Sequence, residues 1–272
     1  MTARAAGEAA DPATLAALAV EVGREAAELL LDGLARPRTH VGTKSSATDM
    51  VTEMDQRSES LIVDRLLAAR PDDGIVGEEG SSRTGTSGVV WVIDPLDGTT
   101  NYLYGHPGFS VSIAAVVAER TLAGVVIDPV HAETWSAWAG GGARCNGQPL
   151  DGPRPCPLGT ALLATGFSYD PERRARQGRA MARVLPQVRD LRRGGGAAVD
   201  LCWVARGRVD AFFERGLAPW DLAAGGLIAE EAGARVAGLD GGPAGTGGVL
   251  AAHPALFDRL AACLVEAGAG DA

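Results

Sequence analysis

The chain has 272 residues, of which 46% are hydrophobic and 22% charged, so it can bury a sizeable core and extensive disorder is excluded. Its net charge of −9 disfavours a broad nucleic-acid-binding surface, and no apolar run approaches the roughly 20 residues that span a bilayer. Its four cysteines are widely spaced and form no Cys-x-x-Cys pair, which argues against a zinc knot or a disulfide scaffold. A cytoplasmic protein without a membrane partner is therefore expected.

The first half of the chain is predicted to pass from helices to strands. Residues 1–13 lack the apolar centre of a secretory signal and are expected to form a flexible tail. Apolar residues then recur at helical spacing over 14–34 and again over 55–69. Shorter apolar runs follow, with a hairpin turn expected at Glu119-Arg120. The predicted strands are 74–77, 88–94, 109–118, 121–128 and 132–138.

A second lobe is predicted to begin near residue 150, at the proline-rich segment DGPRPCP. Its predicted strands are 161–167, 187–191, 208–213, 234–238 and 247–252. Its predicted helices are 172–185, 197–206, 221–232 and a last one from 254. Helices and strands alternate in both lobes, 14–150 and 151–272, so we expect an α+β protein in which layers of helix and sheet form one catalytic domain.

Acidic residues stand where predicted strands end or a helix begins. Glu78 and Glu79 follow the first strand, and Asp94 ends the next one. Asp97 comes three residues later, and Asp221 opens an apolar helix. Taken singly, an aspartate could cap a helix and the glutamate pair could be solvated. Together they would repel one another without a cation. Oxygen ligands without histidine or cysteine at ligand spacing suit Mg²⁺, with Mn²⁺ as a substitute.

The segment Gly98-Thr99-Thr100 adds a second chemical function to these acids. A glycine at a helix start lets backbone N–H groups approach an anion, and the local dipole favours negative charge. Metal ligands followed directly by such amides predict a combined cation and phosphate site.

Two phosphatase chemistries could use a combined site of this kind. In the haloacid-dehalogenase type an aspartate attacks phosphorus within D-x-D-G-T, but here Asp94 and Asp97 are one residue too far apart. That type also has its motif near the N-terminus, whereas more than 90 residues precede it here. The other chemistry activates water at bound cations and needs no covalent protein intermediate, and it is the one we favour.

These residues also carry a resemblance to a known family. VGEE at 76–79, WVIDPLDGTTNY at 91–102 and PWDLAAGGLIAEEAGA at 219–234 resemble the three signatures of the inositol monophosphatase family. TKSSATDMVTEMDQRSE at 43–59 is similar to its N-terminal block, and the likeness runs from about residue 14 to about residue 265. Within the family, the segments most similar to bacterial inositol-1-monophosphatases are TGFSYDPERR, RRGGGAAVDLC and GRVDAFFERG.

The resemblance implies a layered αβαβα sandwich, a homodimer, magnesium dependence with two or three ions, and inhibition by lithium. Asp94 would bridge the two main ions, and Glu78 would help to place a third. The metal ligands that the family pattern implies are Glu78, Asp94, the Leu96 carbonyl, Asp97 and Asp221.

The family pattern also implies roles in binding substrate. Gly98 and Thr99, with Thr100 beside them, would bind phosphate, and Thr99 assisted by Asp49 would orient the attacking water. Lys44 matches a lysine of a mobile loop near the site. The residues expected to face substrate hydroxyls are Asp97, Ala197, Glu214 and Asp221.

The predicted function is hydrolysis of myo-inositol 1-phosphate to inositol and phosphate, catalysed by Glu78, Asp94, Thr99 and Asp49. Histidinol phosphate and fructose 1,6-bisphosphate remain alternative substrates. Members of the family that act on histidinol phosphate often carry lysine at the position of Thr100, so the threonine here argues against histidinol phosphate as the substrate.

One departure from the family pattern bears on the substrate. Members commonly have serine or threonine before the Ala-Ala pair, but here Gly194-Gly195-Gly196 precedes Ala197, so a hydroxyl contact on the substrate side is missing.

A non-enzymatic alternative is a regulatory or assembly protein that has kept the fold, but every motif acid is intact here. The arginines of helix 172–185 could form a nucleic-acid stripe, yet the overall acidity favours a solvated or dimer-flanking helix.

Overall fold

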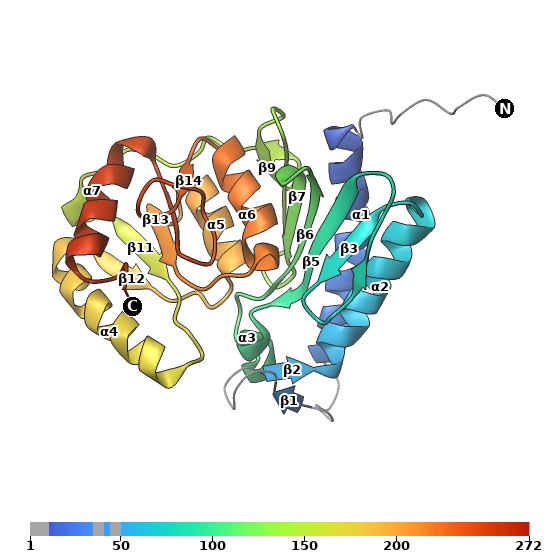
Figure 1. Ribbon diagram of the computed structural model, residues 1–272, viewed down its shortest axis with the longest axis horizontal. Coiled ribbons are helices and arrows are strands. Elements are labelled where there is room, and N and C mark those ends of the chain that lie inside the picture. Colours follow the sequence, from blue (N-terminus) through green and yellow to red (C-terminus); the bar gives the residue numbers. More distant parts are fainter. Residues whose placement is uncertain (1–10, 35–40, 44–49, 272) are drawn as a thin grey trace.

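The computed structural model describes residues 11–34, 41–43 and 50–271. Its helices and sheets form five layers in the order helix, sheet, helix, sheet, helix, which confirms the predicted α+β sandwich (Figure 1). None of the helices in the described ranges is long and apolar enough to cross a membrane.

The first outer layer consists of helices α1 (Pro12–Leu34) and α2 (Glu53–Ala69), which lie side by side on one face of the larger sheet (Figure 1). Thr52 caps α2, because its hydroxyl accepts the N–H of Met54 at 3.0 Å while Asp55 accepts the N–H of Thr52 at 2.8 Å. A short ladder of β1 (Val41–Thr43) and β2 (Met50–Thr52) precedes α2.

The larger sheet has eight strands. They are β3 (Gly74–Gly77), β4 (Ser82–Arg83), β5 (Val89–Asp97), β6 (Ser110–Val117), β7 (Arg120–Asp128), β8 (Glu133–Trp138), β9 (Ala143–Cys145) and β10 (Gln148–Pro149). Their order across the sheet is β10-β9-β8-β7-β6-β5-β3-β4, and β3 and β5 are parallel.

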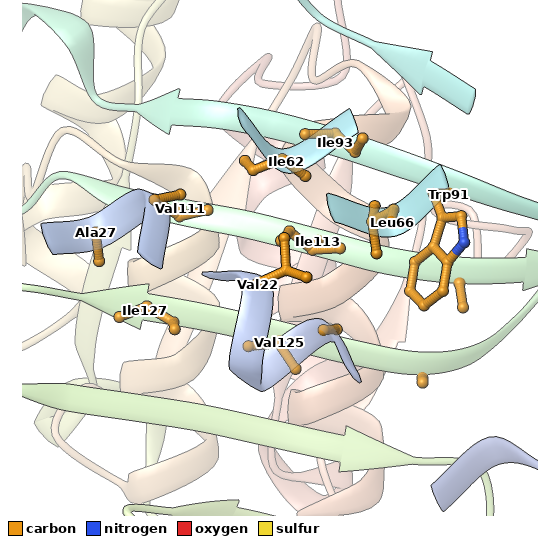
Figure 2. Packing of buried hydrophobic residues seen from close by; sticks show 14 of the residues in the cluster. Val22, Ala27, Ile62, Leu66, Trp91, Ile93, Val111, Ile113, Val125 and Ile127 are labelled. Carbon is orange, nitrogen blue, oxygen red and sulfur yellow. The ribbon is translucent and has the colours of Figure 1, made fainter. Parts of the chain in front are cut away.

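The side chains of this sheet alternate between its two buried faces. Trp91 and Ile93 point toward α1 and α2, where they pack with Ile62 and Leu66 in one core cluster (Figure 2). Val92, between them, belongs to a second cluster on the opposite face. A strand buried on both faces reads as a continuous apolar run, which explains the sequence VVWVI before Asp94.

The middle layer consists of α5 (Ala197–Arg206) and α6 (Pro219–Glu231), which pack against both sheets. The smaller sheet has the strands β11 (Leu162–Thr165), β12 (Asp190–Arg192), β13 (Ala211–Glu214), β14 (Arg235–Ala237) and β15 (Val249–Ala252). Their order is β12-β11-β13-β15-β14. Helices α4 (Pro171–Val184) and α7 (Pro254–Glu266) cover its outer face and complete the sandwich (Figure 1).

The structure corrects several predicted bounds. β5 runs on to Asp97 instead of ending at residue 94, and a short helix α3 (Thr99–Tyr104) follows it. The hairpin between β6 and β7 turns at Ala118 and Glu119, both with positive φ, one residue earlier than predicted. The strands β1, β2, β4, β9 and β10 were not predicted. Most of the expected N-terminal tail lies outside the described residues, and the division into lobes at residue 150 stays a prediction.

Candidate functional site

A cavity of about 360 Å³ lies where β5 ends. Its walls come from the turn after β3, from the segment joining β5 to α3, from the start of α5 and from the segment between β13 and α6. The predicted site residues that line it are Glu78, Asp94, Leu96, Asp97, Gly98, Thr99, Ala197, Glu214 and Asp221. Thr100 is exposed and is not among the lining residues. Lys44 and Asp49 lie outside the described residues.

A β-bulge brings the two aspartates of β5 into this cavity. Asp94 pairs with Ser112 of β6, whereas Asp97 pairs with Ser110, so three residues of β5 are spanned by two residues of β6. In a regular strand, residues three apart would point to opposite faces of the sheet. The extra residue of the bulge removes that alternation, and both carboxylates line the same cavity.

The carboxylates in the cavity interact strongly. Burial raises the pKa of Asp94 well above its usual value, and three neighbouring negative charges raise it further. Those neighbours are Glu78, which also hydrogen-bonds to Asp94, then Asp97 and Asp221. The pKa of Asp97 is also well raised, by burial first and then by Asp221. The acids of three separate segments therefore lie within electrostatic reach of one another.

Asp97 has a structural role besides its place in the cavity. Its carboxylate accepts the backbone N–H of Ala197 at 3.2 Å and of Ala198 at 2.8 Å. These are the first two residues of α5, and Gly196, at the cap position of this helix, has no side chain to satisfy them. Asp97 thus caps α5 from another segment, where the sequence suggested a cap for the helix that follows Asp97 itself.

Asp221 is positioned by the start of α6. Its side chain accepts the backbone N–H of Ala218 at 2.7 Å, which is the bond that an acid in the third helical position commonly makes to the residue before the helix. Asp221 therefore caps the start of α6 and also lines the cavity.

The donor set fits a hard divalent cation. Five acidic side chains line one cavity, those of Glu78, Asp94, Asp97, Glu214 and Asp221, and two of them (Asp94 and Asp97) are buried. All donors are oxygen atoms, which suits Mg²⁺ or Mn²⁺. Among the described residues no three acidic, histidine or cysteine side chains are gathered into a ready-made metal cluster. The raised pKa values show that these carboxylates face one another electrostatically even so.

Thr99 has hydrogen-bond partners that define what its hydroxyl can do. Its Oγ1 lies 3.0 Å from Asp55 Oδ1 and 3.1 Å from the Leu96 carbonyl oxygen, and both oxygens can only accept. A hydroxyl has one proton and two lone pairs. Since the proton is used inside the protein, Thr99 can act toward the cavity only as an acceptor. Asp55 was missed from the sequence, which assigned the support of Thr99 to Asp49.

One face of α2 holds the two acidic segments in place. Ser58 donates to the Pro95 carbonyl at 2.9 Å. The buried Glu59 carboxylate accepts the N–H of Glu79 at 2.8 Å and of Ser81 at 2.9 Å, so it fixes the turn that carries Glu78. A Cβ at Gly77 would overlap the Glu59 carboxylate, which explains why glycine precedes the two glutamates.

The substrate side of the cavity contains the glycine run that departs from the family pattern. Asn101 donates from Nδ2 to the carbonyls of Gly108 and Gly194, both at 2.8 Å, and so fixes the start of the run. Gly195 has a φ of +105°, which favours glycine. A Cβ at Gly196 would lie 2.9 Å from Asp97 Oδ2, so glycine there leaves room for the carboxylate that caps α5.

Two acids lie at or near this side of the cavity: Glu214, which is partly buried and lines it, and the buried Asp200, which lies against Gly194. Burial raises the pKa of Glu214 to about 7, against a lowering effect of Arg193 and a further raising effect of Asp221. Burial and the charge of Glu214 raise the pKa of Asp200 to about 8, again opposed by Arg193. Asp200 Oδ1 has no hydrogen-bond partner in the described part of the chain. Near neutral pH Asp200 is therefore largely protonated, whereas Glu214 is about half protonated.

Three arginines also line the cavity, and the sequence did not assign them to a site. They are Arg173 of α4, Arg193 after β12 and Arg215 after β13. The sequence features that could have pointed to these arginines as site residues were weak. Arg193 precedes the glycine run, Arg215 follows Glu214, and Arg173 is one of five arginines on its helix. Only the fold distinguishes Arg173 from the other four.

Known proteins are similar to this chain over most of its length. The sequence model of the inositol monophosphatase family matches residues 11–269. The inositol-1-monophosphatase SuhB of Mycobacterium tuberculosis is 43% identical over 281 residues, covering 93% of this chain and 94% of its own. The Nus factor SuhB of Escherichia coli K12 is 39% identical over 249 residues, covering 90% and 93%. The solved structure of extragenic suppressor protein suhB from Bartonella henselae matches with a TM-score of 0.88 at 32% identity, covering 92% of this chain and 98% of that one.

Proposed function

The chain belongs to the inositol monophosphatase family and is a phosphatase, and we propose that it hydrolyses myo-inositol 1-phosphate to inositol and phosphate in a Mg²⁺-dependent reaction. The observation that supports this most is the acidic cluster, in which Glu78, Asp94 and Asp221 come from three segments to one cavity. The names of its relatives support inositol 1-phosphate as the substrate.

The same residues would hold the ions that the family generally requires. Two or three Mg²⁺ ions, or Mn²⁺ in their place, would bind to the carboxylates of Glu78, Asp94, Asp97 and Asp221 and to the Leu96 carbonyl, with Asp94 shared between the two main sites. Bound ions of this kind make water more acidic and neutralise the charge that builds up on phosphate. They would also convert a cavity that repels phosphate into one that attracts it.

The residues of the DGTT turn would handle phosphate and water. The backbone N–H groups of Gly98 and Thr99 would bind phosphate oxygens, and glycine at position 98 permits the left-handed conformation, with φ of +88°, that opens this turn. The Thr99 hydroxyl, whose proton is engaged by Asp55 or Leu96, would accept a hydrogen bond from the attacking water and so orient it.

The polyol would lie against the opposite wall. Burial raises the pKa of Glu214 to about 7, and in its protonated form it can donate to one substrate hydroxyl and accept from another. Asp97, Asp221 and Ala197 line the same space.

Three further properties rest on the resemblance alone. We propose that the protein is a homodimer, that it works in the cytoplasm and that lithium inhibits it. Sedimentation at several protein concentrations, and activity measured against added lithium, test the first and the last of these.

A panel of phosphate esters tests the proposed function. Myo-inositol 1-phosphate, histidinol phosphate and fructose 1,6-bisphosphate are compared by kcat/KM, with Mg²⁺ and again with a chelator. We expect phosphate release that depends on Mg²⁺ and is efficient with inositol 1-phosphate. A clear preference for histidinol phosphate contradicts the proposed substrate, and no release from a folded, Mg²⁺-loaded protein contradicts the proposed enzyme.

A further inference from the structure

We propose that a groove along α6, outside the catalytic cavity, is a second ligand site that takes a small apolar molecule carrying a protonated amine. The groove lies between α6, the hairpin of β6 and β7, and the segment that joins β14 to β15. Its volume of about 620 Å³ exceeds the 360 Å³ of the catalytic cavity and lies within the usual range of small-molecule sites, about 300–1,000 Å³. We call it the α6 groove.

The α6 groove adjoins the catalytic cavity but is distinct from it. Leu217 and Ala218 line both, so the two share one wall. The segment that covers the groove is bonded to this wall, because the Thr246 carbonyl accepts the N–H of Gly216 at 3.0 Å. None of the described residues to which we assign a catalytic role lines the groove. A ligand here would therefore use groups that the proposed reaction leaves unused.

The walls of the α6 groove are mostly apolar. Val116 of β6, Leu222 and Ala223 of α6 and Val236 of β14 line it, and each of these side chains is only partly buried. Ligand sites are concave and predominantly apolar, with a small number of polar groups that fix orientation. Removing such apolar surface from water favours the binding of an aliphatic body.

Gly226 keeps the groove open in the middle of α6. Glycine in a helix interior is destabilising relative to alanine, so its presence needs a reason. Packing explains the neighbouring Gly225, because a Cβ there would lie 3.0 Å from the Ala198 carbonyl oxygen. Packing does not explain Gly226, whose Cβ would meet only the end of the Leu222 side chain, at 3.2 Å. Gly226 lines the groove, so the missing side chain leaves space for a ligand.

The charged residues of the groove favour a cation. Three acidic side chains line it, Glu119 in the hairpin and Glu230 and Glu231 at the end of α6, against the single base Arg120, which leaves a net charge of −2. The Glu231 carboxylate is held by the N–H of Gly140 at 2.8 Å. Partial burial and then the charge of Glu231 raise the pKa of Glu230. A cation bound between these two carboxylates would offset their repulsion.

The lining also distinguishes between kinds of cation. None of the described residues that line the groove is aromatic, whereas sites for quaternary ammonium groups use aromatic cages. A protonated primary or secondary amine can instead donate hydrogen bonds to carboxylates. An aliphatic amine, with its apolar part along α6 and its charge at the end of the helix, therefore fits the groove best.

Three hexyl probes test the α6 groove in the Mg²⁺-loaded protein near neutral pH. Hexylammonium, hexanol and hexanoate share one apolar body and differ in charge, and titrations followed by NMR give a dissociation constant for each. We expect hexylammonium to bind about fivefold more tightly than hexanol, the contribution of a solvent-exposed ion pair, and hexanoate to bind most weakly. Equal affinities, or a preference for hexanoate, overturn the proposal.

Variants then separate the groove from the catalytic cavity, which is also acidic. Gly226→Leu fills the groove and should weaken the binding of both hexylammonium and hexanol at least about tenfold, as loss of the apolar contact implies. Glu230→Gln should bring the ratio of their affinities toward one. Glu266→Gln, at an exposed residue of α7 that lines neither site, is the matched control and should leave the ratio unchanged.

The two groove variants keep the test decisive. Glu230 lies at the surface, so its replacement is compatible with folding even if Gly226→Leu is not. Hexylammonium that binds folded Gly226→Leu as tightly as wild type, or a ratio that Glu230→Gln leaves intact, overturns the proposed site. Binding is measured without substrate, so a wild-type protein that releases no phosphate contradicts the proposed function and leaves this test unaffected.

Discussion

Thr99 Oγ1 lies 3.0 Å from Asp55 Oδ1, although 44 residues separate them in the chain. The other oxygen of Asp55 caps α2 by accepting the N–H of Thr52 at 2.8 Å. One carboxylate therefore ties the start of a helix in the outer layer to a hydroxyl in the cavity. This geometry leaves the Thr99 hydroxyl free to accept from water and fixes the direction in which it does so.

Thr99→Val should reveal this role. Valine has the shape of threonine without the hydroxyl, so the attacking water loses a positioned hydrogen-bond acceptor, and we expect kcat to fall about 10²-fold with a much smaller change in KM. Steady-state kinetics with saturating Mg²⁺ measures both constants. Thr99→Ser, which keeps the hydroxyl, is the matched control and should retain most of the activity. Equal losses in the two variants would show that packing of the methyl group matters and the hydroxyl does not.

Asp94→Asn tests the centre of the acidic cluster. Asp94 is buried beside Glu78 and within reach of Asp97 and Asp221, so removal of its charge should weaken ion binding at both main sites. We expect turnover to drop about 10³-fold or more, since metal ions supply several kcal/mol of transition-state stabilisation. Calorimetric titration with Mg²⁺ should show weaker binding in parallel. Near-normal turnover of the variant at saturating Mg²⁺ would remove Asp94 from the bridging role.

Glu59→Gln tests whether α2 positions the metal-binding turn. The Glu59 carboxylate accepts two backbone N–H groups, and the glutamine amide can accept only one of them. We expect the free energy of unfolding to fall by about 2 kcal/mol, the contribution of a buried hydrogen bond to a charged group. We also expect Mg²⁺ affinity to fall, because the turn that carries Glu78 loses its support. Denaturant unfolding and Mg²⁺ titration measure the two effects. Gln56→Glu, on the exposed side of α2, changes charge in the opposite sense and should affect neither.

The acids of the site were predictable because each stands at the end of an apolar run or at the start of an apolar helix. The layered fold was predictable because hydrophobic patterns of period two and period 3.6 alternate along the chain. The bulge between Asp94 and Asp97 was not predictable, since a three-residue spacing places side chains on opposite faces of a regular strand. Asp55 and Glu59 were missed for a related reason. They act on residues 20 to 44 positions away, and only the packing of α2 against β5 brings them together.

The three arginines that line the cavity show the same limit of sequence reasoning. The overall acidity favoured a solvated or dimer-flanking helix for the five arginines of α4, and four of them are exposed. Arg173 differs only in its position in the first helical turn, beside the segment after β13. Nothing local in the sequence distinguishes it from Arg174.

The buried acids predict how stability depends on pH. The pKa of Asp200 is raised from 3.8 to about 8 and that of Glu214 from 4.5 to about 7, both mainly by burial. An acid that binds its proton more tightly in the folded than in the unfolded protein stabilises the fold fully below its unfolded pKa, and this contribution is lost as the pH rises through the folded value. In the presence of a chelator, Tm should therefore fall between pH 5 and pH 8.

Asp200→Asn, which has no proton to lose, should flatten this decline, whereas Asp190→Asn, at an exposed carboxyl, should leave it unchanged. Added Mg²⁺ should raise Tm more at pH 8 than at pH 5, because it binds ionised carboxylates. Calorimetry that finds a constant or rising Tm across this range in chelator would show that these acids stay ionised in the folded protein.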